Sequence, residues 1–214
     1  MKTIKYFILG ISMAILTLGG FINLIAQKST IEFLETYTGE EITSRLEKGD
    51  MLFQLMDINQ NDQGSSLVGY CIPDRTEGLW EYIHSEPFLQ KLPGDVMFSW
   101  GSTQGERGIP LYALKNPGKN HAGPDGSDIE QVEVVSDNQS GPNSLLISFS
   151  SAGAEKWAEL TGSNIGRDIA IVINDRVWSA PRVQDQIKMG KCMISGNFSK
   201  REASALREQL DPNP

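Results

Sequence analysis

The sequence contains few of the residue types that ligate metals or act as catalytic nucleophiles. Among its 214 residues there are two cysteines, Cys71 and Cys192, and two histidines, His84 and His121. The two histidines are too few and too scattered to predict a metal site. No Gly-x-Ser-x-Gly, His-Glu-x-x-His or phosphate-binding loop occurs, and nothing singles out one pair of carboxylates for acid–base chemistry. We therefore expect no metal, no cofactor and no catalytic residue, and an enzyme is unsupported.

Basic charge is also scarce. The chain has 27 acidic residues against 19 lysines and arginines, which gives a formal net charge of −8. No stretch gathers lysine and arginine into a stripe that could neutralise phosphates, so nucleic acid is not an expected partner. The length and the 39% hydrophobic content suffice to bury one core of ordinary size.

Charge is absent altogether from residues 6–26, near the start of the chain. Lys2 and Lys5 precede this apolar run, which is the order found in an export signal. The run can be the apolar part of a signal peptide that is cleaved after Ala26. It can equally remain as a single membrane anchor, because one helix of this length matches the bilayer core. In both cases the lysines stay in the cytoplasm. We expect the rest of the chain to be exported, either periplasmic or anchored to the inner membrane facing the periplasm.

The two cysteines allow two interpretations in that oxidising compartment. Cys71 and Cys192 can form a single disulfide, or they can remain small buried free thiols. Sequence spacing does not give their separation in the fold. Both alternatives therefore stay open.

Apolar patterning predicts strands in the second half of the chain and a hairpin within it. The predicted strands are Val96–Trp100, Ile109–Lys115, Ile129–Val135, residues 145–149 and Ile169–Ile173. Asn174 and Asp175 predict a tight turn after the last of these. Residues 51–55 are interpreted as a further short buried strand. Frequent hairpin signals without a strict βαβ order indicate an α+β fold, a mixed and largely antiparallel sheet with helices packed on it.

Capping patterns predict where helices begin. Thr38 with Glu41, Asp74 with Glu77, and Ser199 with Glu202 have the spacing of capping boxes. Residues 1–26 are the signal peptide or anchor, residues 27–47 a tether and short helix, and residues 48–214 the folded domain.

Another short helix is predicted before Pro87. Leu79, Trp80 and Ile83 are interpreted as one apolar face of this helix, and proline forces the preceding residue out of helical geometry.

The carboxy-terminal part of the sequence resembles a known family. The resemblance runs through Ser151-Ala152-Gly153-Ala154, Trp157-Ala158-Glu159-Leu160-Thr161, Asn164-Ile165-Gly166-Arg167, Ile169-Ala170-Ile171-Val172, Val177, Ser179-Ala180-Pro181, Ile194-Ser195-Gly196-Asn197-Phe198 and Glu202-Ala203. These residues resemble the SecD and fused SecDF accessory subunits of bacterial protein export, in the head subdomain of their large periplasmic domain. Weaker similarity extends backward, so that the resemblance covers roughly residues 48–210.

This resemblance implies a periplasmic head-like domain that contacts exported polypeptides, or subunits of the Sec translocon, without catalysing a reaction. Members of the family continue into membrane helices that carry proton flow, and we expect this chain to lack that motor. Cys71, Trp178 and Cys192 stand where the family leads us to expect other residues. The alternative is a head fold reused to bind one folded periplasmic or envelope partner, unrelated to export.

Residues 177–193 carry the candidate polypeptide-binding side chains. Trp178, Val183, Ile187 and Met189 place large apolar groups around a segment that Pro181 interrupts. An unfolded polypeptide offers apolar side chains and unpaired backbone, which an apolar surface beside a free strand edge can bind. The same side chains can equally belong to the core.

Overall fold

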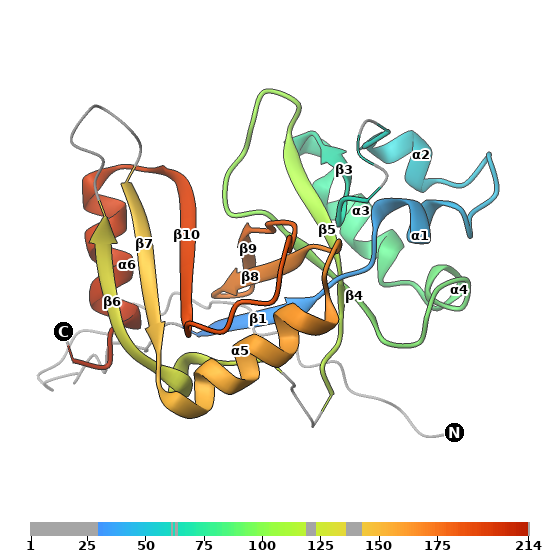
Figure 1. Ribbon diagram of the computed structural model, residues 1–214. Coiled ribbons are helices and arrows are strands. Elements are labelled where there is room, and N and C mark those ends of the chain that lie inside the picture. The colour runs from blue at the N-terminus through green and yellow to red at the C-terminus, as the bar shows by residue number, and fades with distance from the viewer. Residues whose placement is uncertain (1–29, 61, 63, 119–122, 136–142, 214) are drawn as a thin grey trace, which may run out of the picture.

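The computed structural model describes residues 30–60, 62, 64–118, 123–135 and 143–213. The predicted signal peptide or anchor, residues 1–26, and His121 lie outside these residues. Within the described residues, none of the helices has the length and apolar character needed to span a bilayer. The fold is α+β, as predicted, and is built from three antiparallel sheets with helices packed against them (Figure 1).

The amino-terminal lobe contains the four-stranded sheet, in the order β2-β3-β5-β4. Its strands are β2 (Asp57–Ile58), β3 (Leu67–Cys71), β4 (Val96–Trp100) and β5 (Ile109–Lys115). Its helices are α1 (Gly39–Thr43), α2 (Leu52–Leu55), α3 (Thr76–Ile83) and α4 (Glu86–Leu89), with the 3-10 turn η1 (Pro73–Arg75) before α3. Figure 1 shows these helices gathered at one end of the molecule. The lobe has its own hydrophobic cluster, in which Leu79, Ile83 and Phe88 of the helices pack with Phe98 and Leu111 of the sheet.

The second lobe contains two three-stranded sheets. One has the order β1-β8-β9 and the other β10-β7-β6. The strands are β1 (Ile31–Glu35), β6 (Ile129–Val135), β7 (Asn143–Phe149), β8 (Ile169–Ile173), β9 (Arg176–Ser179) and β10 (Lys191–Phe198). The helices are α5 (Ser151–Ser163) and α6 (Lys200–Leu210), with the 3-10 turn η2 (Gly126–Asp128) before β6.

Strand β8 lies between β1 and β9 and is buried on both faces. Ile169, Ile171 and Ile173 alternate onto the face that packs with α5 and the sheet of β6, β7 and β10. Ala170 and Val172 lie on the opposite face, where they contact Leu114 of β5. The continuous apolar run of β8 is therefore explained by its position between the two lobes.

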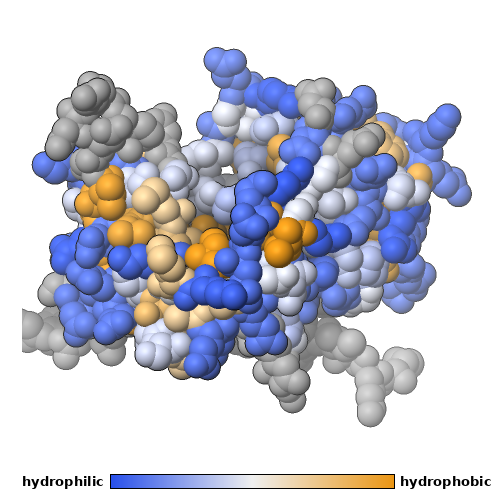
Figure 2. Space-filling view, in the orientation of Figure 1, coloured by the Kyte–Doolittle hydropathy of each residue, from blue (hydrophilic) through white to orange (hydrophobic). Residues whose placement is uncertain are grey.

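Helix α6 covers one face of the sheet formed by β6, β7 and β10. Its predicted capping box is confirmed, since the Ser199 hydroxyl accepts from the Glu202 N–H and the Glu202 carboxylate accepts from the Ser199 N–H. Figure 2 shows apolar side chains over the other face of this sheet. Val135, the last residue of β6, is 37% exposed, and Met193 of β10 is 52% exposed.

Several local predictions differ from the structure. The Asp74–Glu77 pattern does not cap α3, whose N-cap is Arg75 without a side-chain hydrogen bond. Residues 51–55 do not form a strand, because Leu52–Leu55 is helix α2 and the Asp50 carboxylate accepts from the Leu52 N–H at its start. A short apolar run does not distinguish a strand from a buried helix by periodicity. The predicted tether contributes β1, which pairs with β8 along Ile31–Glu35. Strand β10 is not predicted either, although it pairs with β7 over most of its length.

A buried polar contact joins the two lobes beside β8. The Asp168 carboxylate, 5% exposed, accepts from the N–H and the hydroxyl of Ser66 and from Nε of Arg182, at 2.7, 3.1 and 3.2 Å. The hydroxyl of Thr36 donates to the Asp168 carbonyl at 2.8 Å. One carboxylate thus satisfies a buried backbone donor of the first lobe and a cation of the second.

Ile171→Ala should lower the free energy of unfolding by about 2–5 kcal/mol, because it leaves a cavity next to a fully buried strand. Ile165→Ala is the matched control, since Ile165 is 55% exposed and its truncation should change stability by less than about 0.5 kcal/mol. Denaturant titration of both variants measures the difference. Equal losses would contradict the placement of β8 at the centre of the core.

Asp168→Asn should cost about 1–3 kcal/mol, because an amide has one acceptor oxygen where the carboxylate offers two to Ser66 and Arg182. Asp62→Asn is the control. Asp62 also pairs with Arg182, at 3.2 Å, but its side chain is 55% exposed, so its substitution should cost less than about 1 kcal/mol. Thermal or chemical denaturation of the two variants distinguishes a buried junction from a surface ion pair.

Candidate functional site

The structure places the four sequence-predicted binding residues in different environments. The Trp178 ring is half-buried, stacks on Phe198 with centroids 5.5 Å apart and donates from Nε1 to the Ile173 carbonyl. Val183 is buried in the same core cluster. Ile187 and Met189 are 37% and 82% exposed. Trp178 and Val183 therefore pack mainly within the protein, and polypeptide binding by this set stays a prediction.

The loop that carries the two exposed residues lies along α5. Gln186 donates from Nε2 to the Ala158 carbonyl, and the Ile187 N–H donates to the Thr161 hydroxyl, both at 3.0 Å. These contacts fix the loop to a helix, so Met189 is presented on an ordered backbone.

The two cysteines are free and buried in separate clusters. Cys71 packs in the amino-terminal lobe and Cys192 in the second lobe. Burial raises the pKa of both thiols, and that of Cys192 to about 12. The structure does not join them, and the disulfide stays one of the two interpretations of the sequence.

Alkylation in denaturant without reductant should modify both cysteines, because the structure has two thiols. Mass spectrometry counts the added groups. In native protein both thiols should react slowly at neutral pH, since burial keeps them protonated and covered. A chain that takes up alkyl groups only after reduction would contain the disulfide instead.

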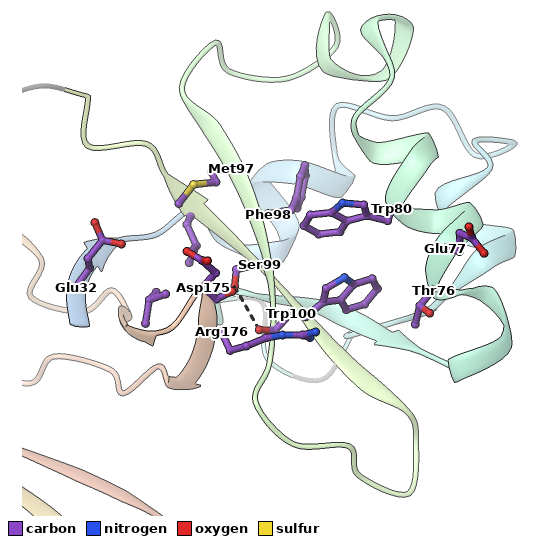
Figure 3. Close-up of a pocket in the computed structure, with 12 residues that line it drawn as sticks. Glu32, Thr76, Glu77, Trp80, Met97, Phe98, Ser99, Trp100, Asp175 and Arg176 are labelled. Atoms are coloured by element: carbon purple, nitrogen blue, oxygen red, sulfur yellow. Dashed lines mark hydrogen bonds between the residues drawn. The ribbon is translucent and has the colours of Figure 1, made fainter. Parts of the chain in front are cut away.

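An apolar cleft of about 650 Å³ lies between the two lobes, where α3 and β4 approach β1 and the β8–β9 turn. Figure 3 shows the residues around it. The lining residues are Glu32, Thr76, Glu77, Trp80, Met97, Phe98, Ser99, Trp100, Leu114, Val172, Asp175 and Arg176. The cleft is thus formed by segments far apart in the sequence.

Two tryptophans form the apolar wall of the cleft on the side of the first lobe. The rings of Trp80 and Trp100 lie 5.8 Å apart, inclined by 31° (Figure 3). Trp80 is 37% exposed, whereas Leu79 and Ile83 are fully buried. The prediction that Trp80 shares the buried face of α3 is therefore wrong. Successive residues of a helix are separated by about 100°, so Trp80 is turned away from Leu79 and faces the cleft.

Hydrogen bonds between β4 and β5 determine which backbone groups face the cleft. The Gly101 N–H donates to the Pro110 carbonyl at 2.8 Å, and the Asn116 N–H donates to the Asp95 carbonyl at 2.7 Å. In an antiparallel pair such hydrogen-bonded positions recur at every second residue. The odd-numbered residues of β4 therefore point their backbone groups to β5, and the even-numbered ones point away.

The outward backbone groups of β4 are those of Phe98 and Trp100. Within the described residues, no strand pairs along this edge. A parallel bridge from Gly101 to Val177, with the Ser102 N–H donating to the Val177 carbonyl at 2.8 Å, closes only its carboxy-terminal end. The cleft thus contains a free strand edge.

Charged groups border the cleft unevenly. Glu32, Glu77 and Asp175 contribute carboxylates and Arg176 contributes one cation. Asp175 is held at the rim by the predicted tight turn, in which Asn174 and Asp175 have φ angles of 50° and 61°. The Ser99 hydroxyl donates to the Asp175 carbonyl at 3.0 Å and ties this turn to β4.

The cleft offers no nucleophile activated by a base. Its two hydroxyls, on Thr76 and Ser99, both donate to backbone carbonyls. No group of three or more histidine, cysteine or acidic residues in the described part of the chain could hold a metal ion. The arrangement suits binding of an apolar and partly extended ligand.

Sequence reasoning missed this cleft because its walls come from the β1, α3, β4 and β8–β9 segments. The available signal was the pair of tryptophans at positions 80 and 100, half of the four in the chain. Their convergence depends on tertiary packing and is not visible in local patterns.

Comparison with known proteins finds similarity to subunits of bacterial protein export. Residues 112–213 match the family model of the SecDF P1 head subdomain. The chain is 33% identical to the protein translocase subunit SecD of Magnetococcus marinus over 166 residues, 73% of this chain and 30% of that protein. It is 27% identical to SecD of Calditerrivibrio nitroreducens over 170 residues, 78% of this chain and 33% of that protein.

A crystal structure of SecDF in a super-membrane-facing form aligns with a TM-score of 0.47 and 22% identity, over 86% of this chain and 19% of that one. The chain spans roughly a fifth to a third of the length of the curated SecD relatives it matches, with shares of 21%, 19% and 33%. Residues 112–213 of this chain are thus similar to the SecDF P1 head subdomain.

Proposed function

We propose that this chain is a non-enzymatic, periplasmic SecD/SecDF-like module that contacts exported polypeptides while they are unfolded. Its partners are then unfolded secretory chains and subunits of the Sec translocon. Support comes from the family match of residues 112–213 and from the similarity to SecD over most of the chain. The observation that carries the proposal is the apolar cleft with the exposed ring of Trp80 beside a free strand edge.

The cleft matches the chemistry of an unfolded chain. Such a chain exposes apolar side chains and backbone donors and acceptors that a folded protein has already paired. Trp80 and Trp100 provide a rigid apolar wall, and aromatic side chains of this size are common energetic centres of binding surfaces. The backbone of Phe98 offers a donor and an acceptor beside that wall.

Catalysis is not part of the proposal. The hydroxyls of Thr76 and Ser99 are bound to carbonyls, and no base is hydrogen-bonded to either oxygen. A binding role is the simpler account of a cleft lined mainly by apolar side chains.

Trp80→Ser should weaken binding of a reduced and alkylated, permanently unfolded protein by at least about tenfold, because truncating a central tryptophan removes a large apolar contact. Met189→Ser is the control from the sequence-predicted set, since its side chain is 82% exposed and outside the cleft lining. Fluorescence anisotropy of the labelled unfolded protein measures both affinities. Loss of binding in the Met189 variant alone would move the site to the loop along α5.

Photocrosslinking in cells tests the export role. A photoreactive residue replacing Trp80 should capture many different secretory chains or Sec translocon subunits, identified by mass spectrometry, and one replacing exposed Ile165 serves as the surface control. Recurrent capture of one folded envelope protein from position 80 would favour the reused interaction module instead.

A further inference from the structure

We propose that the interlobe cleft binds its polypeptide as an added β-strand along β4, and that it selects segments in which basic residues alternate with apolar ones. This inference rests on the proposed function and specifies the binding mode and the class of segment. Three features carry it: the direction of the β4 backbone groups, the different character of the two sides of β4, and the charges at one end of the cleft.

The free edge of β4 has backbone groups available for pairing. Phe98 turns its N–H and its carbonyl to the cleft and forms no hydrogen bond with either within the described residues. The Trp100 N–H points the same way, whereas the Trp100 carbonyl is directed to Val177 by the Gly101–Val177 bridge and also accepts from the Ser99 hydroxyl at 3.2 Å. The Val96 N–H is already bound to the Pro93 carbonyl. Pairing therefore centres on Phe98 and extends to Trp100.

A strand added at this edge would place its side chains alternately on the two sides of β4, because side chains alternate across a sheet. On one side it meets Trp80 and Trp100, whose neighbours belong to the core of the first lobe. On the other side it meets Met97 and Val172, which belong to the cluster between the lobes. Both sides accept apolar contact, and the second is bordered by two carboxylates.

Glu32 and Asp175 supply the acidic groups of the second side. Glu32 lies opposite Val172 in the β1–β8 pair, so both side chains are on the face toward the first lobe. Figure 3 shows Glu32, Met97 and Asp175 grouped together, apart from Trp80 and Trp100. Among the residues that the structure describes, neither carboxylate forms an ion pair.

A lysine or arginine side chain fits this second side. Its methylene stem can cover Met97 and Val172 while its charged end reaches the carboxylates. At the other end of the cleft, Glu77 and Arg176 contribute opposite charges, so that end has no net preference for one sign. The added strand is therefore expected to carry apolar residues toward Trp80 and basic residues toward Glu32 and Asp175.

Backbone methylation of a peptide tests the added strand. The probe is a labelled peptide of about nine residues, enough to exceed the length of β4, in which lysines alternate with valines. Methylating the amide nitrogens of one alternate set removes the N–H groups that face β4, whereas methylating the other set removes only N–H groups that face solvent. One methylated set should bind at least about tenfold more weakly than the other. Equal affinities of the two sets would overturn strand addition.

Charge substitution tests the selection of basic segments. The double variant Glu32→Gln with Asp175→Asn removes both carboxylates, and asparagine tolerates the positive φ at position 175. It should bind the lysine peptide about 3- to 10-fold more weakly and should bind a matched peptide with serine in place of lysine unchanged. The double variant Glu130→Gln with Glu133→Gln, at two exposed residues of β6 outside the cleft lining, removes the same number of charges and is the control for net charge.

The outcomes separate this inference from the proposed function. If the unfolded protein binds in a manner dependent on Trp80, but both methylated sets and both peptides bind equally, the proposed function stands and this inference is wrong. If neither peptide nor unfolded protein binds, both are wrong. Circular dichroism and denaturation of each variant confirm that the fold is retained before its affinity is interpreted.

Discussion

The arrangement of the whole molecule depends on the burial of β8 on both faces. The five residues of this strand are at most 5% exposed, and none is polar. Because side chains alternate along a strand, one set of them completes the core of the second lobe and the other set contacts the first lobe. The strand cannot shift by one residue, since a shift would exchange these two sets. One short segment thereby fixes both the packing within a lobe and the contact between lobes.

The position of the cleft is determined by the extent of the contact between the two lobes. The two lobes meet through Leu114, Ala170 and Val172, and the sheets bridge at Gly101 and Val177. A side chain at position 101 would clash, since a Cβ there would lie 2.5 Å from Cγ of Pro110. Strand β4 extends back from this bridge without a strand partner on its outer edge, within the described residues. The four-stranded sheet is joined to the three-stranded one at β5, through Thr36 and Leu114, and at the end of β4, so the outer edge of β4 between these contacts is left beside the apolar surface.

Sequence patterns predicted the elements whose information is local. Strands β4, β5, β6 and β8 and the capping boxes at Thr38 and Ser199 agree with the structure, because alternation and capping depend on residues close in the chain. Strand β10 was missed because Gly196 and Asn197 have the composition of a turn, although Cys192 and Ile194 alternate inward as a strand requires. The cleft could not be predicted, since Trp80 and Glu32 become neighbours only through the packing of β8.

The binding energy available in the cleft suits brief contact. The free edge of β4 supplies about three backbone hydrogen bonds, each contributing about 0.5–1.5 kcal/mol net, and the tryptophan wall adds the burial of a few apolar side chains. The loss of translational and rotational freedom on association costs about 4–15 kcal/mol, and ordering the unfolded segment adds to that cost. The balance favours weak association, and the proposed contact with exported polypeptides requires this because each segment must be released before the next one can occupy the same edge. A deeper or fully enclosed cleft would hold one segment and block the rest, so the open form of this cleft is consistent with successive contacts along a moving chain.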